Sequence, residues 1–435
     1  MIGKTGALKS HDSTDSPKPV NSTHMLKLAK HERYTPARSY HLTEFIVSFI
    51  LVCCTAVPSL SQASDREFRS VLRDKAAFTA NDFSALERGE MVVKLLPVGD
   101  KREVAICGVM RMQVPVAVSL EAFQESMTQR GRKSVLEIGK FSSPPSLEDV
   151  QGLTLEDRDI EDLKQCVVGQ CELKMSAAMI ERFRKEVDWS SPDYRTQATH
   201  LFRQMLLEYV RDYLAHGNSA LIEYRDQTPG VRLDEEHRSL LESSLYINDF
   251  APELTKYLQG FPQPELMGVE NAINWTKVNF GLKPVTIITH VATYRRRFNG
   301  VPQILVVSKQ LYANHYFDSS LALTALINVA RDGSTSDSYL LYTNRSRADS
   351  LAGSFSKLKR ALVEEEAVAN LNAILIQTLQ NLENRSMKQV GSQRFGTQDI
   401  VELLFGGRRF VWWIIPITAL GALFGLRRRI QKRSV

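Results

Sequence analysis

The residues from 91 to 141 follow a hydrophobic and polar pattern that predicts three strands and one helix. Met91–Leu96 and Glu103–Val114 favour β structure, and the turn-forming stretch Pro97–Asp100 between them predicts a hairpin. Ser119–Arg130 carries apolar residues three or four positions apart, which is typical of a helix. Lys133–Phe141 returns to a strand pattern.

From 176 to 258 the apolar positions recur at steps of three or four, so this region is predicted to be helical. The clearest stripe consists of Tyr194, Ala198, Leu201, Met205 and Tyr209. Such a stripe indicates a helix that packs into a core rather than one that holds a cofactor.

After Pro264 the period changes to that of strands, and a long helix then ends the pattern. The four predicted strands are Asn274–Phe280, Val285–Tyr294, Gln303–Tyr312 and Tyr339–Asn344, and the helix is Leu351–Leu382. The fold class predicted from this order is α+β, with an antiparallel sheet, a long C-terminal helix and a helical insertion.

An uncharged apolar run, Phe45–Val57, is too short to span a bilayer and has the length of a signal-peptide core. Ser61-Gln62-Ala63 follows it with small residues where a signal peptidase cuts, so we expect cleavage after Ala63. The alternative is an uncleaved N-terminal anchor. The leader is long, and Met25 is an alternative start to Met1.

A second uncharged run, Phe410–Leu426, predicts one transmembrane helix, with a buried core helix as the alternative. Five basic residues follow it and two precede it, so the positive-inside rule places residues 427–435 in the cytoplasm. The predicted organisation is a leader and signal at 1–63, an exported domain at 64–385 with its helical region at 176–260, a linker at 386–409, the membrane helix at 410–426 and a cytoplasmic tail. The bulk of the protein is then periplasmic or extracellular.

The net charge of +6 belongs to the two ends of the 435-residue chain. Residues 1–63 hold seven basic and four acidic side chains, and seven more basic residues lie after 407, which leaves about −4 for the region between. Nucleic-acid binding needs a clustered basic face on the folded part, so the charge argues against a nucleic-acid partner. The 43% hydrophobic content is that of a globular protein.

Cys166 and Cys171 enclose a short loop that contains Gly169, and in an exported domain we expect them to form a disulfide. A metal site would need further cysteine or histidine ligands nearby, and the sequence supplies none. A redox-active pair usually has closer spacing. Cys107, in a predicted strand, is interpreted as a small buried side chain.

The runs DIEDLKQCVVGQCELK, SKQLYANHYF and NRSRAD resemble a group of exported bacterial proteins without an established activity. The resemblance spans most of residues 70–385 and implies a cell-envelope setting. The order of strands before a long final helix also resembles the START-like helix-grip fold. That resemblance implies an apolar cavity between sheet and helix that would suit an apolar or lipid ligand.

A set of polar residues is predicted near the ends of neighbouring strands, where the side chains could converge at one rim. His290, His315 and Asp318 are candidates for acid–base catalysis, because a histidine and a carboxylate are the usual groups for that chemistry. Tyr312, Tyr316 and Arg347 are candidates for ligand binding. The other interpretation is that all six form ordinary hydrogen bonds and ion pairs at strand ends. No cofactor motif and no metal-ligand spacing is present in the sequence.

Three functions remain open from the sequence. The leading prediction is a membrane-anchored envelope protein, not an enzyme, that binds an apolar or lipid ligand. The second is an envelope hydrolase that uses His290 or His315 with Asp318. The third is a structural or assembly protein that acts through the helix predicted at Leu351–Leu382. The sequence predicts contact with the membrane and identifies no protein partner.

Overall fold

The computed structural model describes residues 60–114, 116–131, 134–279, 283–298, 300–328, 338–352 and 356–390. All of them belong to one compact unit. The leader, most of the predicted signal, residues 391–409 of the predicted linker, the predicted membrane helix and the basic tail lie outside the described residues, whereas residues 386–390 of that linker belong to a helix.

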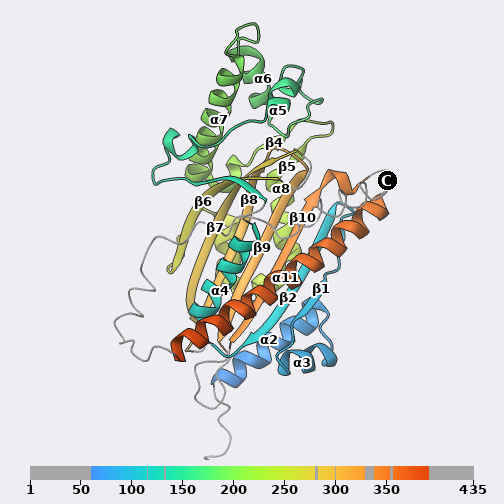
Figure 1. The fold of residues 1–435 in the computed structure, drawn as a ribbon, viewed down its shortest axis with the longest axis vertical. Helices are drawn as coiled ribbons and strands as arrows, with labels where there is room; N and C mark the ends of the chain where they lie inside the picture. Colours follow the sequence, from blue (N-terminus) through green and yellow to red (C-terminus); the bar gives the residue numbers. More distant parts are fainter. Residues whose placement is uncertain are drawn as a thin grey trace, which may run out of the picture. The chain divides into compact units, whose positions relative to one another are not determined.

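The centre of the unit is an eight-stranded sheet in which every neighbouring pair is antiparallel (Figure 1). The strand order is β1-β2-β10-β9-β8-β7-β6-β3. The bounds are β1 Val92–Leu95, β2 Glu103–Met112, β3 Val135–Lys140, β6 Val269–Val278, β7 Val285–Phe298, β8 Val301–Ala313, β9 Phe317–Asn328 and β10 Ser338–Ala348. The predicted β1–β2 hairpin is confirmed, whereas β9 was not predicted.

Two helices, α4 (Val116–Gly131) and α11 (Ser356–Val390), pack on one face of the sheet. In Figure 1 α11 runs diagonally across this face, and it includes most of the long helix predicted from the sequence. Gly108 of β2 permits the close approach, because a Cβ there would lie 2.8 Å from Leu371 Cδ2 and 3.2 Å from Leu375 Cδ1. The side chains between these helices and the strands form an apolar core.

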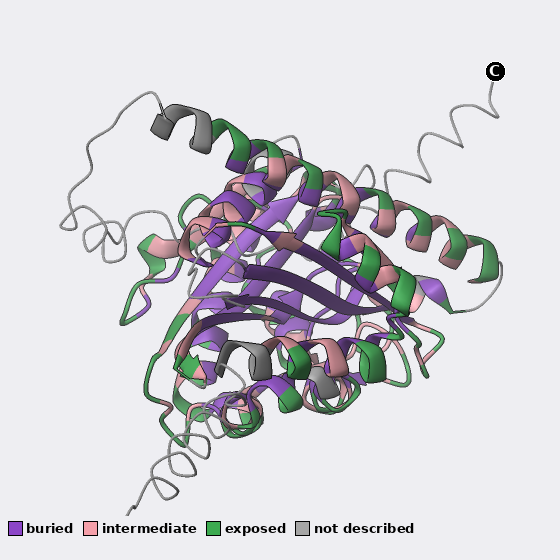
Figure 2. Ribbon diagram, turned by 90° about the horizontal axis from the view of Figure 1, so that it is seen from below, coloured by how far each residue is buried: buried purple, intermediate pink, exposed green. Residues whose placement is uncertain are grey.

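Helices also cover the opposite face, so the strands lie between two helical layers, as Figure 2 shows. The helices besides α4 and α11 are α2 Leu60–Ala76, α3 Ala80–Glu87, α5 Asp157–Leu163, α6 Ala177–Glu186, α7 Tyr194–His216, α8 Leu233–Ser243, α9 Leu245–Phe250 and α10 Pro252–Gly260. Phe68 of α2 stacks on Tyr339 of β10 with 4.7 Å between ring centroids. On α7, the Tyr209 hydroxyl donates to the Leu311 carbonyl at 2.8 Å. These contacts fix both helices against the sheet.

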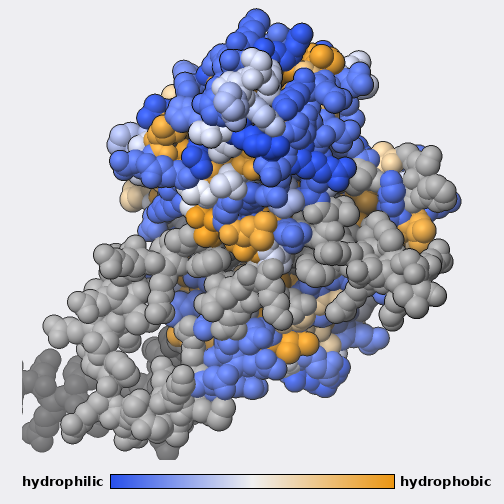
Figure 3. Space-filling model, turned by 45° about the horizontal axis from the view of Figure 1, so that its top comes forward, coloured by the Kyte–Doolittle hydropathy of each residue, from blue (hydrophilic) through white to orange (hydrophobic). Residues whose placement is uncertain are grey.

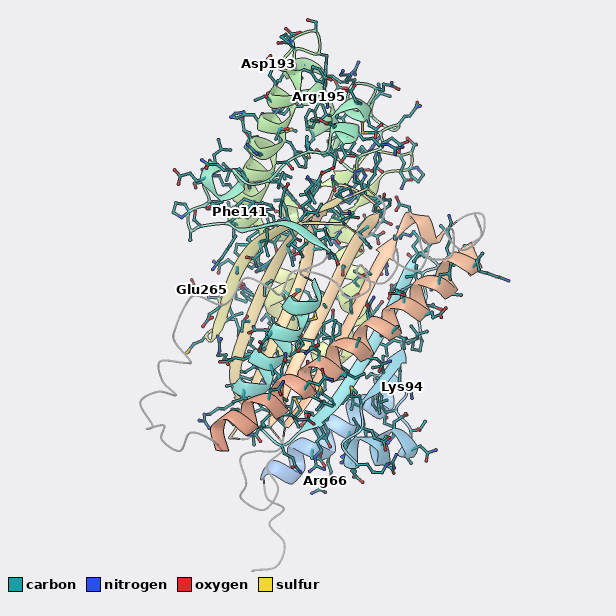
Figure 4. The ribbon with its side chains drawn as sticks, viewed as in Figure 1. Arg66, Lys94, Phe141, Asp193, Arg195 and Glu265 are labelled. Carbon is teal, nitrogen blue, oxygen red and sulfur yellow. A yellow bond between two sulfur atoms is a disulfide. The ribbon has the colours of Figure 1, made fainter. Side chains whose placement is uncertain are left out.

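The helical insertion lies between β3 and β6, which are neighbours in the sheet. In Figure 4 Phe141 marks where the chain leaves β3, Glu265 lies shortly before β6, and Asp193 and Arg195 lie at the far tip of the insertion. The short strands β4 (Glu223–Tyr224) and β5 (Val231–Arg232) pair within it. The surface of this region is largely hydrophilic with small apolar patches (Figure 3).

The fold class predicted from the sequence is wrong in its membrane-spanning helix. None of the helices in the described ranges is both long enough and apolar enough to cross a bilayer. The segment predicted to do so, 410–426, lies outside those ranges. The described fold is α+β with a large antiparallel sheet.

Candidate functional site

On the face of the sheet that carries α11, the inward side chains change from apolar to polar along the strands. We call seven of them, which bear hydroxyl or carboxamide groups and no charge, the polar sheet face. They are Asn274, Thr276, Thr289, Gln310, Ser320, Asn344 and Ser346, and all seven are buried.

The strand register brings three members of the polar sheet face into one row. Asn274 of β6 lies opposite Thr289 of β7, which lies opposite Gln310 of β8. Residues directly opposite in antiparallel strands point to the same face. The neighbour of Thr289, His290, bonds Tyr213 of α7 on the other side of the sheet, so the row faces the α11 side.

One half of the polar sheet face satisfies its own hydrogen-bonding groups. The hydroxyls of Ser320 and Ser346 lie 2.8 Å apart. Asn344 donates from Nδ2 to Ser320 Oγ at 3.2 Å and accepts from Ser346 Oγ at 2.8 Å. This half needs no further partner to be stable.

The other half contains buried polar atoms without a partner. Both carboxamide atoms of Asn274 and of Gln310, and the hydroxyl of Thr276, make no hydrogen bond within the described structure. Asn274 and Thr276 are 0% exposed and Gln310 is 2% exposed. An unpaired buried polar group costs about 1–3 kcal/mol, so this half has donors and acceptors that the described residues leave unused.

A second polar cluster lies at the end of the sheet where the chain enters β9 and leaves β10. The Lys174 ammonium lies 2.9 Å from Asp318, 2.6 Å from Asp349 and 3.7 Å from Asp226. Arg102 adds a contact of 3.1 Å to Asp318. Residues from four distant stretches of the chain therefore meet around one lysine.

Burial sets the protonation of this cluster. It raises the pKa of Asp318 to about 7, and Lys174 opposes the shift only in part. The pKa of Asp349 is lowered, because its hydrogen bond with Asp318 and the charge of Lys174 outweigh its own burial. For Lys174, burial alone would lower the pKa, but the surrounding carboxylates raise it. The proton of the aspartate pair therefore stays on Asp318.

Arg347 joins the same end of the sheet through carboxylates. It lies 2.9 Å from Glu103 of β2 and 2.9 Å from Glu236 of α8. Arg345 lies 2.6 Å from Glu103. The predicted convergence at one rim thus brings Arg347 and Asp318 into one ionic network, in which both already have protein partners.

The two candidate histidines lie apart from that network. His315 Nε2 lies 3.1 Å from both carboxylate oxygens of Asp159 in α5, so its partner is Asp159 rather than Asp318. Beside it, the Tyr316 hydroxyl accepts a hydrogen bond from the Lys283 amide at 3.1 Å. His290 is bonded through Nδ1 to the Tyr213 hydroxyl and through Nε2 to Asn271 Oδ1, each at 2.8 Å.

Burial and the charge of Lys309 lower the pKa of His290 to about 3, so its ring is neutral at physiological pH. Because Asn271 Oδ1 only accepts, Nε2 carries the proton and Nδ1 accepts from Tyr213. Tyr312 is wholly buried and its hydroxyl donates to the Lys174 carbonyl at 2.9 Å. His290 and Tyr312 thus have the partners of ordinary core residues.

Cys166 and Cys171 form the predicted disulfide. Their loop is anchored to the strand region of the insertion, since Gly169 N donates to Arg225 O at 2.7 Å and Cys171 N to Asp226 O at 2.9 Å. Cys107 is free and wholly buried, and burial raises its thiol pKa to about 12. In the described ranges no cluster of His, Cys, Asp and Glu could hold a metal ion.

A groove of about 760 Å³ lies on the α11 side near Met112, at the opposite end of β2 from the ionic cluster. Its lining mixes Leu86, Met112, Val114, Leu379 and Leu382 with Glu87, Arg88, Arg111 and Glu383. It does not include any residue of the polar sheet face.

No protein-family model, no curated protein and no solved structure matches this chain. The resemblances to exported bacterial proteins and to the START-like fold stay predictions, and the function is argued from the geometry.

Sequence reasoning missed the unpaired members of the polar sheet face. Asn274 and Thr276 lie in the predicted strand Asn274–Phe280. Gln310 lies in the predicted strand Gln303–Tyr312. Three polar residues in two strands look like solvent-facing positions until the register places them on one buried face.

Proposed function

We propose that the protein is an exported, non-catalytic binding protein whose ligand occupies the polar sheet face. The observation that carries the proposal is the row that joins Asn274 and Gln310, two wholly unpaired carboxamides on one buried face. A ligand that pairs these groups would recover the free energy lost by burying them.

The chemistry of the face argues for an uncharged ligand with several hydroxyl or amide groups, such as a carbohydrate. A carboxamide donates through its nitrogen and accepts through its oxygen, as a hydroxyl-rich ligand requires. The seven residues supply such groups and no buried counter-ion, and Lys140 of β3, which lies opposite Asn274, is an exposed cation at the edge of the sheet.

Export is supported by the disulfide between Cys166 and Cys171, because disulfides persist in oxidising compartments and are rare in the cytosol. We propose an envelope or extracellular location on this basis.

The proposal is tested by native mass spectrometry of protein purified from its source, before and after denaturation, and by Gln310→Met. We expect a bound small molecule that the variant lacks. We also expect the ligand-free variant to unfold at a higher urea concentration than ligand-free wild type, because methionine fills the space without an unpaired amide.

Gln303→Met in the same strand is the matched control, since Gln303 accepts a hydrogen bond from Arg296 at 3.0 Å. It should keep the bound molecule and lose stability. Two results together would contradict the proposal: purified Gln310→Met that still carries the bound mass, and ligand-free Gln310→Met that is no more stable than ligand-free wild type.

The apolar or lipid ligand predicted from the sequence has a different place to bind. Met112, Val114 and Leu379 line the groove beside α11 and would contact the apolar part of a lipid. Arg88 and Arg111 line the same groove and would contact an anionic headgroup. Solvent extraction followed by lipid mass spectrometry distinguishes the two ligand classes. A lipid that Gln310→Met still binds would favour the groove over the polar sheet face. The hydrolase and the assembly protein stay predictions.

A further inference from the structure

Three lysines lie buried beside the sheet, and they differ in their partners. Lys174 has the three aspartates described above, and Lys277 lies 3.3 Å from Glu137 and 2.5 Å from Glu156. Lys309 of β8 is 5% exposed and has no carboxylate within ion-pair distance in the described ranges. Burying a charged ammonium group without a counter-ion costs desolvation free energy. The burial of Lys309 therefore needs a physical reason.

Among the described residues the Lys309 amine makes one hydrogen bond, to Asn218, whose orientation is fixed. Asn218 Nδ2 donates to the carbonyls of Leu258 at 2.9 Å and Gln259 at 2.8 Å, which leaves Oδ1 to face the amine. Gly217 makes this possible, since it has φ +62° and a Cβ there would lie 1.7 Å from Phe261 O. The described residues thus give the Lys309 amine one hydrogen-bond acceptor, Asn218 Oδ1, and no carboxylate partner.

The side chains of Tyr213, His290 and His237, which surround Lys309, are neutral. Its amine lies 5.2 Å from the centroid of the Tyr213 ring on α7, and its charge acts on His290 of β7 and His237 of α8. His237 is 6% exposed, and its ring lies beside the backbone of Gln310, the residue that follows Lys309 in β8. Arg347 of β10 is the other charge that acts on His237.

We propose that Lys309 is a reactive amine that forms an imine with an aldehyde or ketone ligand, with His237 as the proton carrier. The nitrogen lone pair attacks the carbonyl carbon, and one of the two nitrogen protons passes through His237 to the carbonyl oxygen, which gives a carbinolamine. The second nitrogen proton then passes by the same route to that hydroxyl as the carbon–oxygen bond breaks. Water leaves and a carbon–nitrogen double bond remains. Lysine amines that are kept neutral by burial are the ones that perform this chemistry in proteins.

The environment keeps this amine neutral. Burial lowers the pKa of Lys309 to about 7, so about half of its amine is neutral at pH 7. A lysine of ordinary pKa has about three orders of magnitude less of the neutral form at that pH. Because Lys309 points away from the polar sheet face, this proposal stands or falls separately from the ligand proposed there.

The experiment is substoichiometric labelling of the folded full-length protein with formaldehyde and cyanoborohydride, followed by peptide mass spectrometry. We expect Lys309 to be methylated at least about tenfold faster at pH 7 than Lys174 or Lys277, which carry paired charges. Its rate should rise with pH and level off above pH 7, while surface lysines keep accelerating beyond pH 9. His237→Leu should slow Lys309 and leave the surface lysines unchanged.

Lys309→Met identifies the labelled peptide, and wild-type labelling gives the result even if that variant does not fold. Labelling of Lys309 no faster than that of surface lysines would overturn the proposal. So would labelling that occurs only at the rate of global unfolding.

Discussion

At the scale of single residues, the buried charges of this protein fall into two kinds. Lys174 was buried together with carboxylates, which hold it in its charged form. Lys309 was buried with an amide and neutral rings, which favour its uncharged form. The difference lies in the partners, because both side chains are almost fully removed from solvent.

Asp318→Asn should change how stability depends on pH. The folded-state pKa of Asp318 is about 7, above its ordinary value, so folding favours the protonated form. Its contribution is fully present below pH 4 and is lost as pH rises through 7, by up to about 1.4 kcal/mol per pH unit. Asparagine does not ionise, so the variant should lose less stability than wild type between pH 5 and 8.

Urea unfolding at several pH values measures this effect. Glu242→Gln, at an exposed position of α8, is the control and should follow the wild-type curve. Parallel wild-type and Asp318→Asn curves would show that Asp318 is ionised in the folded protein throughout this range.

The sequence indicated part of the candidate site at this scale. Asp318 and Arg347 were identified because charged residues at predicted strand ends gather at a rim, and they do share an ionic network. Asn274 and Gln310 were not identified, because their common face depends on a register that includes a β-bulge between Ile288 and Thr289. A one-residue slip would point such side chains the other way, and no local pattern reveals it.

At the scale of elements, the strands with regular alternation were predicted well and β9 was missed. Leu321 and Leu323 face one helical layer, while Ala322 and Leu326 face the other. A strand buried on both faces has no polar alternation, and a run rich in alanine and leucine does not favour β structure locally. Only its place between β8 and β10 explains its conformation.

The disulfide between Cys166 and Cys171 contributes to the free energy of unfolding, and this contribution can be measured. Cys166→Ala/Cys171→Ala should lower the free energy of unfolding by about 2 kcal/mol, because the closed loop is short and constrains the unfolded chain only modestly. Urea titration measures the loss, and wild type treated with a phosphine reductant should show the same change. Equal midpoints for oxidised and reduced wild type would contradict the expectation.

At the scale of the whole molecule, the cluster around Lys174 ties the insertion to the sheet. Lys174 and Asp226 belong to the insertion, whereas Asp318 and Asp349 belong to β9 and the turn after β10. Its side chain therefore connects segments that are far apart in sequence through one buried charge.

Lys174→Met should destabilise the protein by about 3–5 kcal/mol, because Asp226, Asp318 and Asp349 would lose the buried ammonium that lies among them and, among the described residues, only Asp318 would keep a cationic contact, with Arg102. The loss should be larger at pH 8 than at pH 5, where protonation relieves the repulsion. Adding Asp318→Asn should restore part of the stability. Lys185→Met, at an exposed position of α6, is the control with no expected effect. A loss that is the same at both pH values would contradict an electrostatic cause.

The pairing of β2 with β10 joins Glu103 to Arg347, which are 244 residues apart. During synthesis β2 emerges early and has only β1 beside it until nearly all of the domain has left the ribosome. Loop closure over such a distance is slow, so the chain spends a long time with unpaired strand edges. This delay leaves an interval in which the polypeptide is still unfolded, which is the state that a narrow translocation pore can accept. In the same interval a chaperone would shield the largest number of unpaired strand edges.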